Sequence, residues 1–311
     1  MQLKRFMSVG GLALATGLLA IGDASACSIC RCGDPTFNAL GKEGVPQSGL
    51  RLALDVDRLE KSQGGDVPGD YEDIVEERVT LLGAYALTER VGLFARIPYS
   101  RRKLAETAGG DTERSSGSGL ADPELYGQVR VWSSPFETDV GLRTSVFVVA
   151  GVKTSWGENN LQRDGARADE HLQPGTGSTD WFGGLAGSHQ LNPKSALFAS
   201  VQYRSTGRNE VGYRYGSIWL ANVAYEHKLN DRFDTAMELN YRHAARDAVD
   251  FDGNIDDNTG GSMLFITPRL LFSIGGKWVL RGAVQIPLTQ SGLNGVQHEN
   301  AVFNVGITYL K

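Results

Sequence analysis

Hydrophobic side chains alternate with polar or small ones over long stretches of this chain. The pattern is clearest between positions 264 and 309, where three runs place an apolar residue at every second position. A period of two is that of a β-strand, whose successive side chains point to opposite faces. Each run is about ten residues long, whereas strands of soluble sheets have roughly five or six. Length, alternation and arginines on the less apolar face predict a transmembrane β-barrel.

The same pattern begins at Gly49 and predicts about twelve antiparallel strands, an even number as in single-chain bacterial barrels. One of these strands is expected from Tyr213 to Tyr225. Short turns, such as Gly275–Lys277, alternate with long polar loops, which are expected at 60–72, 101–119, 155–179 and 244–258. A soluble β-sandwich is the main alternative, but it rarely has such long strands or such regular loop asymmetry.

The loop lengths also predict an orientation in the bacterial outer membrane. Outer-membrane barrels have short periplasmic turns and longer outside loops. The first connection is long, so both termini are expected on the periplasmic side. The sequence is therefore divided into a signal peptide (1–26), a periplasmic segment that could fold into the barrel as a plug (27–48) and the barrel itself (49–311).

The N-terminus has the features of an export signal. Lys4 and Arg5 precede an apolar stretch from about 7 to 21, and Ala24–Ala26 supplies an A-x-A cleavage site. The mature chain would begin at Cys27, and a cysteine at this position is where lipoproteins carry their lipid. Lipid attachment is therefore an alternative, although Ala24 stands where lipoproteins usually carry a larger aliphatic residue.

Composition narrows the function classes. The chain of 311 residues is 41% hydrophobic and carries a net charge of -5. Apart from the N-terminus, no apolar run approaches the roughly 20 residues of a spanning helix. No basic patch of the kind that binds nucleic acid is present. A signal for an enzyme is also missing, because no G-x-S-x-G and no convincingly spaced carboxylate pair appears.

All three cysteines fall in one short motif, Cys27, Cys30 and Cys32. In an oxidising periplasm a Cys27–Cys30 disulfide would leave Cys32 over. The alternative is a soft-metal site for copper or zinc made by the three thiolates. A c-type haem is disfavoured because Arg31, not histidine, follows the C-x-x-C. We expect no other cofactor.

Charged residues on the strands are expected to line the lumen, because charges cannot face hydrocarbon cheaply. The predicted lumen residues are Arg51, Asp55, Arg78, Arg96, Glu124, Arg130, Arg143, Arg204, Glu226, Glu238, Arg242, Arg269 and Arg281. One interpretation is an arginine-biased channel for small polar or anionic organic solutes. The other is a lattice of salt bridges that fills a narrow barrel.

One acidic loop resembles a calcium loop in part. Asp250, Asp252, Asn254 and Asp256 place oxygen ligands at alternate positions around Gly253. The glycine comes too early for an EF-hand, and no glutamate closes the site. A cation site and a plain acidic surface loop therefore both stay open.

Several short segments resemble the outer-membrane transporter family named after the meta-pathway of phenol degradation. They are Gly119–Leu125, Gly151–Thr154, Gly260–Pro268, Val284–Leu288 and Leu293–Gln297. The resemblance covers most of the chain from about Gly49 and implies a β-barrel that passes small organic solutes. The cysteine motif departs from the family pattern. So does the C-terminus, which ends in Tyr309-Leu310-Lys311 instead of the aromatic residue that the barrel-assembly machinery reads.

Three functions follow from these patterns. The first is an outer-membrane channel for small solutes, surrounded by outer-membrane lipid and inserted by the barrel-assembly machinery. The second is a barrel with a metal or redox task at its periplasmic cysteines. The third is a structural barrel that does not conduct.

Overall fold

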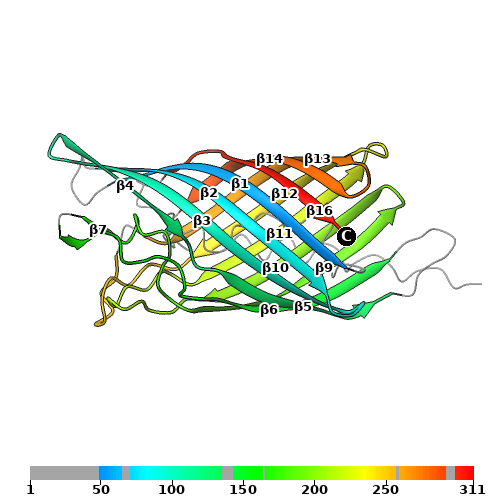
Figure 1. The fold of residues 1–311 in the computed structure, drawn as a ribbon, viewed down its shortest axis with the longest axis horizontal. Coiled ribbons are helices and arrows are strands. Elements are labelled where there is room, and N and C mark those ends of the chain that lie inside the picture. Colours follow the sequence, from blue (N-terminus) through cyan, green and yellow to red (C-terminus); the bar gives the residue numbers. More distant parts are fainter. Residues whose placement is uncertain (1–48, 65–70, 135–142, 164, 257–258, 292–297) are drawn as a thin grey trace, which may run out of the picture.

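The computed structural model describes residues 49–64, 71–134, 143–163, 165–256, 259–291 and 298–311. Within them the chain forms one closed antiparallel sheet and a small separate hairpin (Figure 1). In chain order the strands are β1 (Leu50–Gly64), β2 (Tyr71–Ala86), β3 (Val91–Ala108), β4 (Asp111–Leu120), β5 (Glu124–Ser133), β6 (Thr144–Lys153), β7 (Gln162–Arg163), β8 (Ala166–Arg167), β9 (Asp180–Asn192), β10 (Ser195–Ser205), β11 (Ile218–Lys228), β12 (Phe233–Ala244), β13 (Gly261–Ile274), β14 (Trp278–Ser291), β15 (His298–Glu299) and β16 (Val302–Leu310).

The sheet closes into a 12-strand barrel, as the alternation predicts. β1 pairs with β2 on one side and with β16 on the other, from Arg51 opposite Leu310 to Arg58 opposite Phe303. One position in the wall is shared by β4 and β5, which both pair with β3. Among the described residues, no helix is long and apolar enough to cross a membrane.

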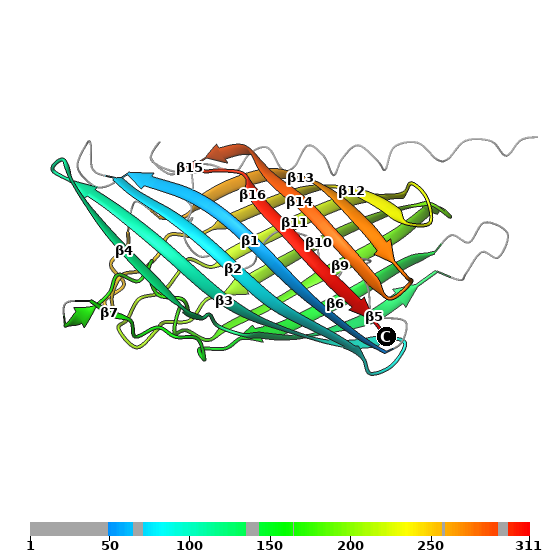
Figure 2. The ribbon, with the colours of Figure 1, turned by 45° about the horizontal axis from the view of Figure 1, so that its top comes forward.

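The short turns that join β2 to β3, β9 to β10, β11 to β12 and β13 to β14 lie at one end of the barrel, which we call the turn end, whereas the tight β3–β4 turn lies at the opposite end. The chain end lies there too, and Lys311 N donates to Leu50 O at the start of β1 (Figures 1 and 2). The predicted Gly275–Lys277 turn is present, and Gly275 and Gly276 have φ of 61° and 75°. Positive φ at two consecutive residues is the hairpin geometry that glycine favours. The opposite end carries the long connections, and we call it the loop end.

The two faces of the barrel differ as the alternation predicts. Outward positions form an apolar belt, in which Leu54, Leu81 and Val305 are 44%, 47% and 64% exposed. A surface this apolar fits hydrocarbon better than water. Inward positions are mostly polar yet buried, so the interior is packed by side chains from opposite parts of the wall. The chain is thus an outer-membrane β-barrel.

Two predicted loops are wrong, because they are partly strands. Residues 60–64 continue β1, 71 and 72 begin β2, and the range 101–119 forms the end of β3 and most of β4. These strands rise beyond the belt, where outward positions carry charge, as at Arg58 and Arg101. Side chains still alternate between the two faces there, but the outward ones are no longer hydrophobic, so the sequence of these stretches looks like that of polar loops. Figure 2 shows the β3–β4 hairpin reaching past the rest of the barrel.

The strand expected from Tyr213 is also wrong at its start, because β11 begins at Ile218. Tyr213 and Tyr215 lie in the preceding connection and are buried at 7% and 2% exposure. Both tyrosines are buried because they pack against other connections and the wall at the loop end of the barrel, and not because they lie on a strand.

Candidate functional site

The barrel interior is built from buried ion pairs. Of the thirteen predicted lumen residues, eight are buried: Asp55, Arg78, Glu124, Arg204, Glu238, Arg242, Arg269 and Arg281. The other five, Arg51, Arg96, Arg130, Arg143 and Glu226, are partly exposed. Among the described residues, eight pairings shorter than 3.5 Å join interior arginines or Lys153 to carboxylates. The arginines therefore do not form a continuous unpaired lining.

Glu124 shows how the pairing works. Its carboxylate accepts a hydrogen bond from Arg204 at 2.7 Å and lies 3.3 Å from Arg96, so one acid joins β3, β5 and β10 across the interior. The guanidinium of Arg204 also stacks over the ring of Phe182, 4.8 Å from its centroid. Charge pairs in so buried a setting need several partners to offset the loss of water.

A second group of pairs joins the first strands to the last ones. Arg281 Nη2 donates to Asp55 Oδ1 at 2.8 Å, and Arg242 Nη2 donates to Glu299 Oε2 at 2.7 Å. Glu299 also lies 3.6 Å from Lys61. The Arg281–Asp55 and Lys61–Glu299 contacts span the point where the sheet closes on itself, so they favour this particular closure over a shifted register.

The most extensively bonded pair lies where β4 gives way to β5. Lys153 Nζ donates to Asp122 Oδ2 at 2.9 Å and lies 3.3 Å from Asp180 Oδ2. Asp122 also accepts hydrogen bonds from the backbone N–H of Thr176 at 2.7 Å and of Gly157 at 3.0 Å. The break in the wall is therefore sealed by the connection between β6 and β9. We call this group the Asp122–Lys153 cluster.

Sequence reasoning missed several of these residues as interior charges. They are Glu76, Arg102, Asp122, Lys153, Asp180 and Glu299. Glu76 is two residues before Arg78 and therefore points to the same face of β2, so the alternation could have identified it as an interior residue. Its carboxylate accepts hydrogen bonds from Arg78 and from Ser100. Asp122 and Lys153 stand in two of the segments that carry the family resemblance, but nothing in the sequence says that they meet.

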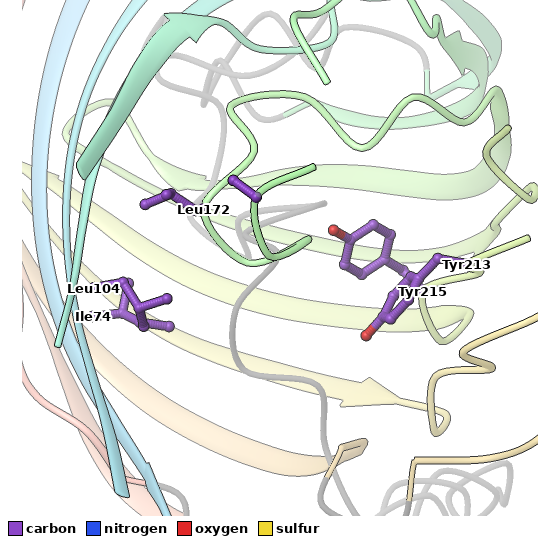
Figure 3. Packing of buried hydrophobic residues seen from close by; sticks show 6 residues of the cluster. Ile74, Leu104, Leu172, Tyr213 and Tyr215 are labelled. Carbon is purple, nitrogen blue, oxygen red and sulfur yellow. The ribbon is translucent and has the colours of Figure 1, made fainter. Parts of the chain in front are cut away.

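The connections at the loop end pack into the mouth of the barrel. Figure 3 shows Leu172 facing Ile74 and Leu104 of the wall, with Tyr213 and Tyr215 beside them. Tyr213 Oη donates to Asp247 Oδ2 at 2.6 Å, so a further connection is tied to this cluster. The described part of the mouth is therefore covered by packed side chains.

His171 is the titrating group of this mouth. Its Nδ1 lies 3.2 Å from Asp169 and 3.7 Å from Glu72 of β2. Burial opposes a charge on the ring, but contact with Glu72 and the charges of Asp169, Glu72 and Asp247 outweigh it and raise the pKa of His171 to about 9. The imidazolium thus helps to hold the 154–179 connection against the wall.

Cavities of different size lie among the described residues of the interior and the mouth. A cavity of about 40 Å³ lies beside the Asp122–Lys153 cluster and is also lined by Arg78, Arg102 and Glu124. Such a cavity holds only a few water molecules. A larger one, of about 210 Å³, opens at the loop end between the β3–β4 hairpin and the 154–179 connection, with Glu106, Glu113 and Leu172 among its lining residues.

A comparison of the sequence with protein families matches residues 57–304 to the family described as "Putative MetA-pathway of phenol degradation". This range includes the whole barrel wall except its two ends. The chain belongs to this family. The resemblance carried by the short segments is thereby confirmed. A search of curated proteins finds no match.

The chain can also be compared with solved barrels. An outer-membrane channel from Pseudomonas putida F1 is 13% identical, with a TM-score of 0.67 over 88% of this chain and 99% of that one. The autotransporter NalP translocator domain from Neisseria meningitidis is 12% identical, with a TM-score of 0.47 over 88% and 91%. The toluene transporter TbuX from Ralstonia pickettii is 10% identical, with a TM-score of 0.44 over 87% and 90%. At these identities the first likeness supports the barrel fold, and the other two add no argument.

The acidic loop of this family member bonds mainly to itself. Asp250 Oδ1 accepts hydrogen bonds from the backbone N–H of Gly253 at 2.9 Å and of Asn254 at 3.1 Å, and these bonds lower the pKa of Asp250. Asn254 Nδ2 also donates to Asp250 Oδ2. Across the described part of the chain, no group of three or more His, Cys, Asp or Glu residues could hold a metal ion. The cation site predicted at Asp250, Asp252, Asn254 and Asp256 stays a prediction.

Cys27, Cys30 and Cys32 lie outside the described residues, as do the predicted signal peptide and the 27–48 segment. A disulfide or a copper or zinc site at the cysteines stays a prediction. The placement of the termini in the periplasm is likewise a prediction, although the two described chain ends do lie at the same end of the barrel.

Proposed function

We propose that the chain is an outer-membrane channel that passes small organic solutes along the barrel axis. The observation that carries this proposal is a closed 12-strand barrel with a polar interior. Barrels of about eight strands are filled by their own side chains, whereas 16 or more leave an open channel. A 12-strand barrel lies between these limits, and the ion-paired interior favours a narrow path over a wide pore.

We further propose that anionic or polar solutes are preferred, because positive charge gathers near the turn end. Arg130 and Arg143 are partly exposed there, and Arg143 is close enough for its charge to act on Arg130. Arg96 is 26% exposed, although it faces Glu124. The deeper arginines contribute less to such a preference, since carboxylates neutralise them.

The test is single-channel conductance of the purified, refolded mature chain in a planar bilayer, with the reversal potential measured across a salt gradient. Discrete steps with an anion preference are the expected result. Removing two interior charges in R130Q/R143Q should shift the reversal potential toward cations. The matched control K194Q/K277Q removes two charges from exposed turns at the same end and should leave it unchanged.

A non-conducting barrel is the second candidate, and the packed mouth around Leu172, Tyr213 and Tyr215 favours it. Silence from barrels whose folding is verified by heat-modifiable gel migration would refute the channel and support this alternative. Conductance without a difference between R130Q/R143Q and its control would keep the channel but refute the preference for anions.

A further inference from the structure

The outward surface of the β3–β4 hairpin carries three exposed basic residues, Arg101, Lys103 and Arg114, which we call the basic patch. Their side chains lie on the face opposite to Glu106 and Glu113, which line the cavity between the hairpin and the 154–179 connection. The patch is therefore separate from the barrel interior and from the proposed solute path.

The sheet register brings the three basic residues together. Arg101 stands opposite Ser118, Lys103 opposite Ser116, and Ala105 opposite Arg114. Residues two apart on a strand are about 6–7 Å apart, and neighbouring strands are about 5 Å apart. Lys103 thus lies about 7–8 Å from each of the two arginines, Arg101 and Arg114 are about 14 Å apart, and serine hydroxyls lie between the three.

Acidic neighbours compensate this cluster only at one edge. Every outward position of β3 beyond Tyr99 and of β4 is basic, hydroxylated or apolar, and none is acidic. Two carboxylates lie on the outward face of β2 at that edge. Glu77 stands opposite Arg101, but its carboxylate accepts a hydrogen bond from Arg58 at 2.9 Å, and the exposed Asp73 stands opposite Ala105. The basic patch therefore has an excess of positive charge.

The height of the patch is set by the apolar belt below it. Tyr99 and Leu120 stand opposite each other and are 46% and 47% exposed. The next outward pair toward the loop end is Arg101 and Ser118. Exposed tyrosines mark the level where hydrocarbon meets headgroups. The headgroup layer of one leaflet is about 5–8 Å thick, or about two strand residues. Arg101 therefore falls at headgroup height, and Lys103 and Arg114 lie just beyond it.

We propose that the basic patch binds the phosphate groups of the phosphorylated glycolipid that forms the outer leaflet, lipopolysaccharide. The long connections of such barrels face outward, which places the β3–β4 hairpin in that leaflet. Arginine and lysine on adjacent strands offer charge-assisted hydrogen bonds to several phosphate oxygens at once. The function of the patch is to anchor this side of the barrel to the lipid around it.

The test measures binding of purified lipopolysaccharide to the folded full barrel in neutral detergent. Each basic residue near an anionic lipid surface strengthens binding about five-fold, so R101Q/K103Q/R114Q should bind on the order of 100-fold more weakly. The control K194Q/R232Q/K277Q removes the same charge from exposed turns at the other end and should bind as the unaltered chain does. Enzymatically dephosphorylated lipopolysaccharide should bind the unaltered chain as weakly as the patch variant binds the intact lipid.

Three outcomes would overturn the proposal. They are equal binding by the patch variant, an equal loss in the control, and undiminished binding of the dephosphorylated lipid. The last would point to the sugar or acyl chains as the attachment. All three substituted side chains are exposed, so folding should survive. If the triple variant does not show heat-modifiable migration, R101Q and K103Q are measured singly, each with an expected loss of about five-fold.

Discussion

Replacing Lys153 by methionine tests whether buried charge pairs hold the broken part of the wall. The Lys153 side chain is 4% exposed and faces Asp122 and Asp180, which are 2% and 1% exposed. Methionine would leave two buried carboxylates without their cation, and such a loss costs about 3–5 kcal/mol. Asp122 keeps its bonds from Thr176 and Gly157. The free energy of unfolding should therefore fall by about 3 kcal/mol, at the lower end of this range.

The assay is urea unfolding of the barrel in lipid vesicles, followed by tryptophan fluorescence. With a urea dependence of about 2 kcal/mol per molar, K153M should lower the midpoint by about 1.5 M. The exposed Lys194 provides the control, since K194M should stay within about 0.5 kcal/mol of the unaltered chain. D122N/K153M should lose less than K153M, because it removes one of the two stranded charges. A K153M barrel as stable as the K194M barrel would refute the reasoning.

Two further predictions concern the mouth and the interior. Because the pKa of His171 is raised from 6.5 to about 9, its hold on the 154–179 connection should be complete below about 6.5 and should be lost as pH rises through about 9. Hydrogen–deuterium exchange of this connection should rise over that window, and H171Q should remove the pH dependence. In the interior, G306V should destabilise the barrel by about 1–3 kcal/mol, because a side chain there would displace Asp55 and Arg281. G282V should not destabilise the barrel, because a side chain at Gly282 meets no other atom. Equal urea midpoints for the two variants would contradict a filled interior.

The alternation predicted the barrel because it expresses one physical constraint directly. A strand that separates hydrocarbon from a polar interior must be apolar at every second residue. Leu52, Leu54 and Val56 follow this rule outward, while Ala53 and Asp55 are buried inward. Beyond the belt the constraint is relaxed, and the sequence then gives too little signal to separate strand from loop. That is why the ends of β1 and β3 were predicted to be loops.

The pairing of the interior charges could not be predicted from the alternation. Parity indicates that Arg242 points inward, but its partner Glu299 is fixed by the tilt and closure of the sheet. The same holds for Arg204 and Glu124, which are 80 residues apart in the chain. The predicted lining therefore includes the correct face and the carboxylates Asp55, Glu124 and Glu238, but neither the pairing of these charges nor the partners Glu76 and Glu299.

The Asp122–Lys153 cluster links the family resemblance to a structural need of the barrel. Two of the resembling segments, Gly119–Leu125 and Gly151–Thr154, meet where the wall changes from β4 to β5. Pro123 lacks an N–H, and its carbonyl accepts a hydrogen bond from the backbone N–H of Thr154 at 2.8 Å. A strand that ends here leaves an edge in the membrane, where unsatisfied backbone groups are costly. The buried aspartate and lysine fasten a connection over that edge, so these short segments are needed to complete the barrel wall whichever solute passes through it.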